Sequence, residues 1–161
     1  VIDNVLSDYP ELNRYDTIDK VIASLTNINR EDVVSRYSEI VLVNIKIAKE
    51  LKYSIEIMDY LLNKNVMIYL SSNTPLDILK EIIKCRGWNK YFNEIYGYPS
   101  KKDDSLKNII KNNQFSNEEY LVVGDGKGDE SSANINGVDF FKVNKKSLKD
   151  LADFLNIEVS T

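Results

Sequence analysis

Two acids, Asp125 and Asp129, stand four residues apart, directly after a short apolar segment. Residues 120–123 have the composition of a buried strand, and Gly124 ends it just before the first acid. An acid in this position lies at the carboxyl edge of a sheet, where open α/β folds bind ligands. Two carboxylates at such an edge suit Mg²⁺, which accepts one or two protein carboxylates together with phosphate oxygens. An ordinary strand followed by an acidic turn is the alternative interpretation.

A second polar group follows the apolar segment 66–70. Ser72 and Asn73 come just after this predicted strand, and a helical pattern starts beyond Pro75. Their side chains, together with the free N–H groups at the helix start, could bind a phosphate oxygen. A helix cap without any ligand is equally consistent with these residues.

A pair of lysines, Lys101 and Lys102, precedes the next helical pattern at 103–112. A lysine in this place can act as a fixed positive charge beside a phosphate or a phosphorylated carboxylate. A solvated surface lysine is the alternative for either residue.

The composition of the chain argues against several classes of function. The formal net charge of −4 argues against nucleic acid as the main partner, because such a surface needs clustered Lys and Arg. No apolar run is long enough to span a bilayer, so no membrane partner is predicted. The absence of histidine excludes Ser-His-Asp catalysis and histidine-ligated zinc. The single cysteine, Cys85, excludes an internal disulfide and fits a reducing, cytoplasmic location.

The elements that must position these residues fall into two blocks. The first is all-helical, with apolar stripes at 18–25, 31–51 and 54–62, the last with Ser54 as its N-cap. The second block alternates between predicted strands at 66–70, 94–96, 120–123 and 140–143 and predicted helices at 76–86, 103–112, 130–135 and 147–155. Such alternation predicts an α/β fold, with a parallel sheet and helices on both faces.

The order of these motifs resembles the haloacid dehalogenase superfamily. A strand followed by Ser72-Asn73, a lysine before a helix some 30 residues on, and a strand followed by Gly-Asp-x-x-x-Asp are similar to that family's second, third and fourth motifs. The match continues through Ala133 and Gly137-Val138 after the last acid. The resemblance implies a Rossmann-like core at 54–161 and a small helical cap at 6–53, as in phosphoglycolate phosphatases and β-phosphoglucomutases.

The resemblance also implies a role for each matched residue. Ser72 and Lys102 would be catalytic, and together with Asn73 they would bind the substrate phosphate. Asp125 would be the Mg²⁺ ligand, and Asp129 would support the metal or its waters.

Either lysine could be the motif residue. Lys102 is favoured because Leu106 completes a Lys-x-x-x-Leu spacing that is common in the family, and Lys101 is the close rival.

One family motif is missing from these residues. The first motif, Asp-x-Asp-Gly, supplies the nucleophile and the general acid/base, and it is not found here. Residues 1–8 resemble the stretch that normally follows it, so we expect a first strand and its catalytic loop before residue 1. Val1 should then lie near Ser72 and Asp125, and the strands 66–70 and 120–123 should flank the place of a central strand.

The resemblance implies a Mg²⁺-dependent phosphatase that acts on a small phosphorylated metabolite through an aspartyl-phosphate. Phosphoryl transfer is favoured over dehalogenation, because carbon–halogen cleavage needs no divalent metal. A phosphosugar mutase and a non-catalytic binding or regulatory module of the same fold are the alternatives. The substrate and the oligomeric state cannot be predicted from these residues.

Overall fold

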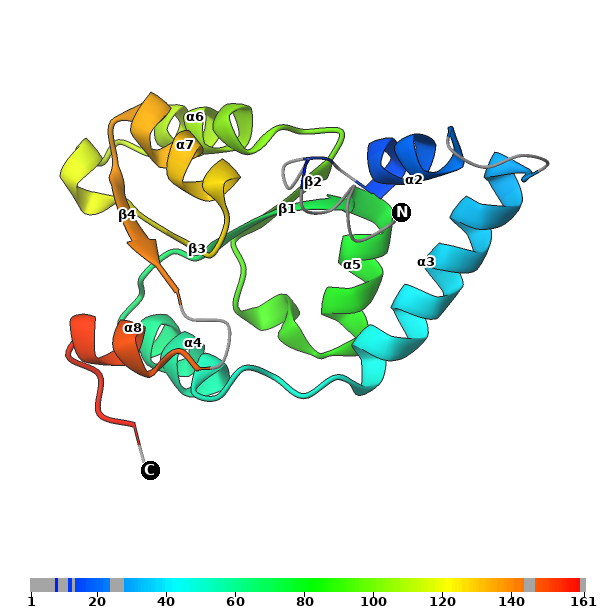
Figure 1. The fold of residues 1–161 in the computed structure, drawn as a ribbon. Helices are drawn as coiled ribbons and strands as arrows, with labels where there is room; N and C mark the ends of the chain where they lie inside the picture. Colours follow the sequence, from blue (N-terminus) through cyan, green and yellow to red (C-terminus); the bar gives the residue numbers. More distant parts are fainter. Residues whose placement is uncertain (1–7, 9–11, 13, 24–27, 144–146, 160–161) are drawn as a thin grey trace.

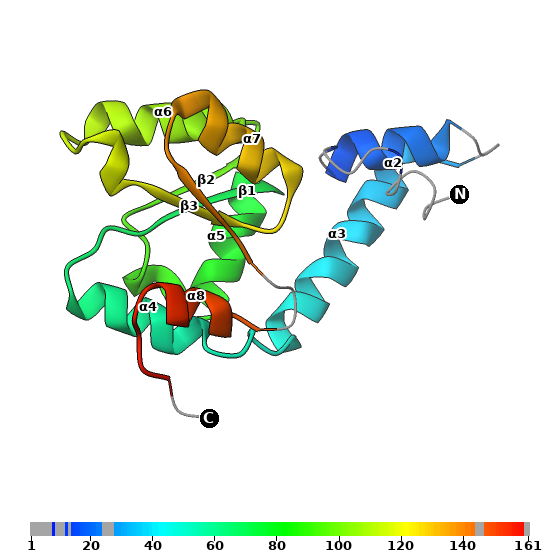
Figure 2. The same cartoon turned by 60° about the vertical axis from the view of Figure 1, so that its left-hand side comes forward.

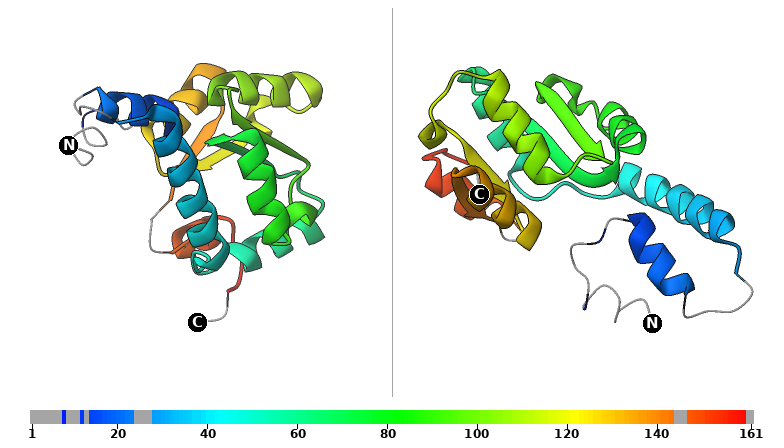
Figure 3. Two further views of the ribbon diagram at one scale, coloured as in Figure 1. Left: turned by 90° about the vertical axis from the view of Figure 1, so that its right-hand side faces the viewer. Right: turned by 90° about the horizontal axis from the view of Figure 1, so that it is seen from above.

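The computed structural model describes residues 8, 12, 14–23, 28–143 and 147–159. Its amino-terminal part contains the helices α2 (Arg14–Ile22) and α3 (Arg30–Ile47). The Asn29 side chain caps α3 by accepting hydrogen bonds from the N–H groups of Glu31 and Asp32. Arg30 at the start of α3 binds Asp19 of α2, with one N–O distance of 2.9 Å. Figures 2 and 3 show these two helices to one side of the strands.

The remaining chain alternates between helices and parallel strands. Strand β1 (Tyr69–Pro75) pairs with β2 (Glu94–Tyr98), and β3 (Leu121–Gly124) pairs with β4 (Asp139–Lys142). The helices of this part are α4 (Ser54–Asn63), α5 (Leu76–Cys85), α6 (Lys102–Asn112), α7 (Lys127–Asn136) and α8 (Lys149–Phe154), with short 3₁₀ turns η1 (Trp88–Lys90) and η2 (Asn117–Glu119). The predicted α/β class is confirmed.

Helices cover the strands from both sides. Figures 1 and 2 show α6 and α7 on one side, and α4, α5 and α8 on the other. A buried cluster joins α4 to α8 through Tyr53, Ile57, Leu151, Ala152 and Ile157. This layering places the carboxyl ends of the strands next to the first turns of α5, α6 and α7. The division into a cap at 6–53 and a core at 54–161 stays a prediction.

Three local expectations need correction. Strand β1 begins later than predicted and includes Ser72 and Asn73, because its pairing with β2 continues to Pro75 after a register shift. Asp129 lies inside α7 rather than on a turn before it. The N-cap of α4 is Tyr53, in the left-handed conformation, and Ser54 is the first helical residue.

Gly97 allows β2 to pack tightly against the turn that links β1 to α5. A Cβ atom at this position would lie 2.7 Å from the Thr74 oxygen and 2.7 Å from Leu76 Cα, which are both backbone atoms. We expect Gly97→Ala to lower the free energy of unfolding by about 1–3 kcal/mol, as overpacking does. Urea unfolding followed by circular dichroism measures this change.

Gly128→Ala provides the matched control. Its Cβ would come no closer than 4.0 Å to Lys102, and it lies within α7, where alanine is favoured over glycine. This variant should be neutral or more stable, by up to about 1 kcal/mol. Equal destabilisation of the two variants would contradict the assigned role of Gly97.

None of the described helices is both long enough and apolar enough to cross a membrane.

Candidate functional site

A lysine and an aspartate from two different helices meet beside the ends of the strands. Lys102 opens α6 and Asp129 lies in the first turn of α7, and their Nζ and Oδ1 atoms are 2.5 Å apart. Their side chains are 22% and 14% exposed, so this ion pair is largely shielded from solvent. Lys101 is exposed and is the N-cap residue of α6, without a capping hydrogen bond from its side chain. The structure therefore brings Lys102, and not Lys101, to the acidic motif.

The position of Asp129 depends on the glycines around it. Its Oδ2 atom accepts a hydrogen bond of 3.2 Å from the N–H of Gly126, just before α7. A Cβ atom on Gly124 would lie only 2.4–2.6 Å from atoms of the Asp129 side chain. Glycine at the end of β3 thus lets this carboxylate lie directly against the strand. Gly124 of the Gly-Asp-Gly sequence is therefore explained by steric fit as well as by the chemistry of the motif.

Asp125 is exposed and follows the last residue of β3. Asp129 follows it four residues later in α7. Among the described residues no group of three or more His, Cys, Asp or Glu could hold a metal ion. Two carboxylates fit Mg²⁺, which keeps several waters and takes its remaining ligands from phosphate. They do not fit a metal that requires a complete set of protein ligands. Both oxygens of Asp129 have partners, Lys102 Nζ and the N–H of Gly126.

Ser72 is half-buried in β1, and its hydroxyl is engaged locally. It donates a hydrogen bond to Thr74 Oγ1 and accepts one from the Thr74 N–H, both at 3.1 Å. Asn73 is exposed beside it. Ser72 can bind a phosphate oxygen by exchanging its bond to Thr74 Oγ1.

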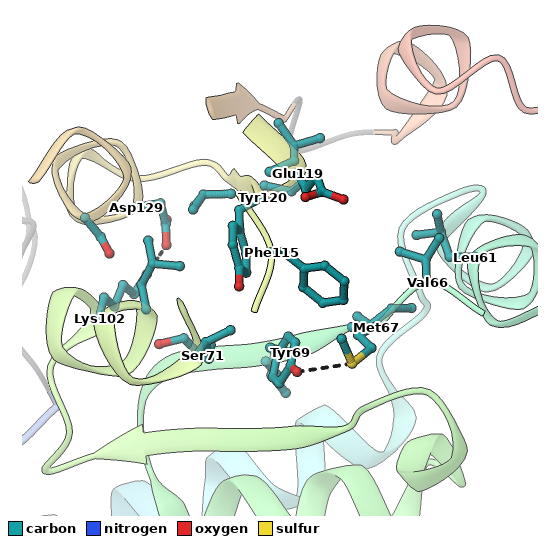
Figure 4. Close-up of a pocket in the computed structure, with 18 of the residues that line it drawn as sticks. Leu61, Val66, Met67, Tyr69, Ser71, Lys102, Phe115, Glu119, Tyr120 and Asp129 are labelled. Carbon is teal, nitrogen blue, oxygen red and sulfur yellow. Dashed lines mark hydrogen bonds and ion pairs between the residues drawn. The ribbon is translucent and has the colours of Figure 1, made fainter. Parts of the chain in front are cut away.

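Ser71 was not among the predicted site residues. Ser71 lines a cavity together with Lys102 and Asp129, whereas Ser72 does not. Figure 4 shows these three side chains at the same end of that cavity. Successive side chains of a strand point to opposite faces, so the repeated serine was itself a signal that one of the two would face the lysine.

The cavity lies between β1 and β3 and has a volume of about 540 Å³. Apolar side chains form most of its wall, with the Lys102–Asp129 pair at one end and Val66 at the other (Figure 4). Strands β1 and β3 do not pair with each other in the described chain, as the sequence predicts. The predicted position of Val1 lies outside the described residues.

Comparison with known proteins identifies the family to which the chain belongs. Residues 3–143 match the model of the haloacid dehalogenase-like hydrolases. No curated protein matches the sequence.

Several solved structures are similar in fold. A hydrolase from Streptococcus pneumoniae TIGR4 has 20% identity and a TM-score of 0.65, over 97% of this chain and 87% of that one. A candidate phosphatase from Clostridium difficile has 18% identity and a TM-score of 0.68, over 92% and 73%. A candidate β-phosphoglucomutase from Thermotoga maritima has 16% identity and a TM-score of 0.68, over 93% and 74%.

At these identities the likeness shows a shared fold, and the family match covers most of the chain. The predicted site residues Ser72, Lys102, Asp125 and Asp129 all lie within the matched range. The chain belongs to the haloacid dehalogenase-like hydrolases.

Proposed function

We propose that this protein hydrolyses the phosphate monoester of a small phosphorylated metabolite, releasing an alcohol and inorganic phosphate with the help of Mg²⁺. The observation that carries this proposal is the contact between Lys102 and Asp129, which joins the third and fourth motifs beside the end of β3. A largely shielded lysine at this place provides a fixed positive charge for a phosphate dianion.

Each residue has a distinct part in this proposal. Asp125 holds Mg²⁺ directly, and Asp129 positions Lys102 while supporting the metal through its waters. Mg²⁺, when bound, neutralises part of the phosphate charge and so favours attack by an anionic nucleophile. Lys102 and the hydroxyl of Ser72 contact the phosphate oxygens, with Asn73 beside them. The family motif that supplies the nucleophile, Asp-x-Asp-Gly, is not found in these 161 residues.

The charge of the two carboxylates also favours a phosphate ester over an organic halide as the substrate. A phosphate dianion must be neutralised before an anion can attack it, and a metal held by carboxylates serves that need. Attack on a carbon–halogen bond meets no such repulsion. A phosphosugar mutase is the second candidate, supported by the similarity to the candidate β-phosphoglucomutase. We also propose that α2 and α3 belong to a cap that selects the substrate.

Metal removal tests the proposed reaction. The intact protein, stripped with EDTA and dialysed, should hydrolyse p-nitrophenyl phosphate at less than a few per cent of its rate in Mg²⁺. Restoring Mg²⁺ should recover the activity, while Ca²⁺, which is larger and more flexible in its coordination, should recover far less. Hydrolysis that does not depend on the metal would contradict the proposal. No hydrolysis in either condition would leave the non-catalytic binding module as the better account.

A further inference from the structure

Helix α3 is apolar on two of its faces. Helices α2 and α5 contact α3, and its half-buried residues Val41 and Ile45 lie on one face. Ile40, Val43 and Ile47 lie on another face, and they are 48%, 62% and 76% exposed. The apolar side of an amphipathic helix normally packs against a partner. The second face is therefore exposed although its composition is that of a contact surface.

Helix α3 also lies at an edge of the molecule. Figure 1 shows it along the right-hand side, with the strands and the other helices to its left. In the left view of Figure 3, taken from that side, α3 lies in front of the core. A second molecule could therefore approach along most of the helix.

The exposed apolar residues follow the spacing of a coiled-coil seam. Steps of four, three and four residues connect Arg36, Ile40, Val43 and Ile47, which we call the outer stripe. The helix has 18 residues and is therefore about 27 Å long. A contact between two helices of this length belongs to the small, weak class of interfaces, for which we expect a Kd of roughly 1–100 µM.

An antiparallel pair of α3 helices makes the outer stripe complementary to itself. When Ile40 lies opposite Val43 of a second copy, a two-fold axis repeats the same contact with the copies exchanged. Arg36 then lies opposite Ile47 of the second copy, and its aliphatic stem can pack on that side chain. Its guanidinium would lie near the carboxyl end of the second α3, where the helix dipole favours a positive charge. Each member of the stripe thus has a matching member in an identical helix.

Polar residues beside the outer stripe fit the same register. Glu39 lies next to position 46 of the second copy, where the sequence has a lysine, and Tyr37 lies next to Asn44. The side chains of Arg36 and Glu39 are 74% and 62% exposed in the single chain, so both are accessible to a second copy. A parallel pair would instead bring the two Arg36 side chains together, which like-charge repulsion opposes. Charge complementarity therefore favours the antiparallel pair.

We propose that α3 is a self-association surface, through which two copies of this chain form an antiparallel dimer with two-fold symmetry. The outer stripe forms the centre of the contact, and Glu39 with the lysine at position 46 forms one flank. The surface includes none of the predicted site residues, so the dimer does not rest on the proposed activity.

Sedimentation velocity of the 161-residue chain, from about 1 to about 300 µM, tests the dimer over the expected range of Kd. The sedimentation coefficient should rise with concentration towards the value of a dimer. Ile40→Asp places a charge in the apolar contact and should weaken association at least about tenfold. Ile135→Asp is the matched control, because Ile135 is 68% exposed on α7, and it should not change the association. A chain that stays monomeric, or a dimer that Ile40→Asp leaves intact, would overturn the proposal.

Disulfide trapping tests the antiparallel register. The background is Cys85→Ser, because Cys85 is exposed. Under mild oxidation, an Ile40→Cys protein mixed with a tagged Val43→Cys protein should give a disulfide-linked heterodimer. Ile47→Cys alone should not be trapped, because the two copies of residue 47 lie about 16 Å apart along an antiparallel pair, beyond the reach of a disulfide. Trapping of Ile47→Cys at the rate of the mixture would refute the antiparallel arrangement.

A charge exchange tests the flank of the contact. Glu39→Lys places lysines next to each other and should weaken association by about three- to tenfold. Adding Lys46→Glu to this variant reverses both charges and should restore the parent Kd to within about twofold. The difference between the single and double variants should shrink as the salt concentration rises. A double variant that associates no better than Glu39→Lys alone would show that the proposed register is wrong.

Discussion

Asp125→Asn in the intact protein should lower Mg²⁺-dependent hydrolysis of p-nitrophenyl phosphate by a factor on the order of 10³ or more. The physical reason is that asparagine keeps the size and one oxygen of the side chain but removes the charge that attracts the metal. Because Asp125 is exposed at the end of β3, the loss of charge should leave the fold intact. Steady-state kinetics at several Mg²⁺ concentrations, with circular dichroism as a check on folding, measure the effect.

Two further variants serve as comparisons for Asp125→Asn. Asp139→Asn removes an exposed carboxylate at the other end of the neighbouring strand β4, and it should keep the parent rate. Asp129→Asn should lie between the two, because it leaves the proposed direct ligand in place while weakening the contact with Lys102. Unchanged turnover in Asp125→Asn would remove this residue from the site.

Lys102→Ala should lower turnover by a factor on the order of 10² or more, as expected when a fixed charge on the transition state is lost. The lysine lies 2.5 Å from Asp129 and is largely shielded, so solvent cannot replace its charge effectively. Lys102→Arg should recover little, because the larger planar guanidinium does not fit a site built for a compact ammonium. Turnover numbers measured at saturating Mg²⁺ and substrate give the comparison.

The adjacent lysine is the matched control. Lys101 is exposed and contributes its backbone to the first turn of α6, so Lys101→Ala should stay within a few-fold of the parent. The reverse ranking of the two variants would show that the motif lysine is Lys101. Loss of activity in Lys102→Ala with an altered circular dichroism spectrum would instead indicate a structural role for the ion pair.

The order of helices and strands was determined by sequence alone. The period of the apolar residues separates helical from extended segments, and the helices predicted at 76–86 and 103–112 match α5 and α6 closely. Strands that alternate with helices of this length favour parallel pairing, so the fold class followed from local pattern. The order of the motifs also predicted that an acid, a serine and a lysine lie at the ends of elements that meet at one edge of the sheet.

Tertiary structure decided which of two neighbouring residues contacts the acidic motif or lines the cavity. Two adjacent lysines are equivalent in a sequence, but only Lys102 lies on the side of α6 that contacts Asp129. The pairing of β1 with β2 moved Ser72 into the strand, and it is Ser71 that lines the cavity with Lys102. Which lysine contacts Asp129 and which serine lines the cavity depend on strand register and on the rotation of a helix about its axis. Both are set by contacts between residues far apart in the chain, which local periodicity does not specify.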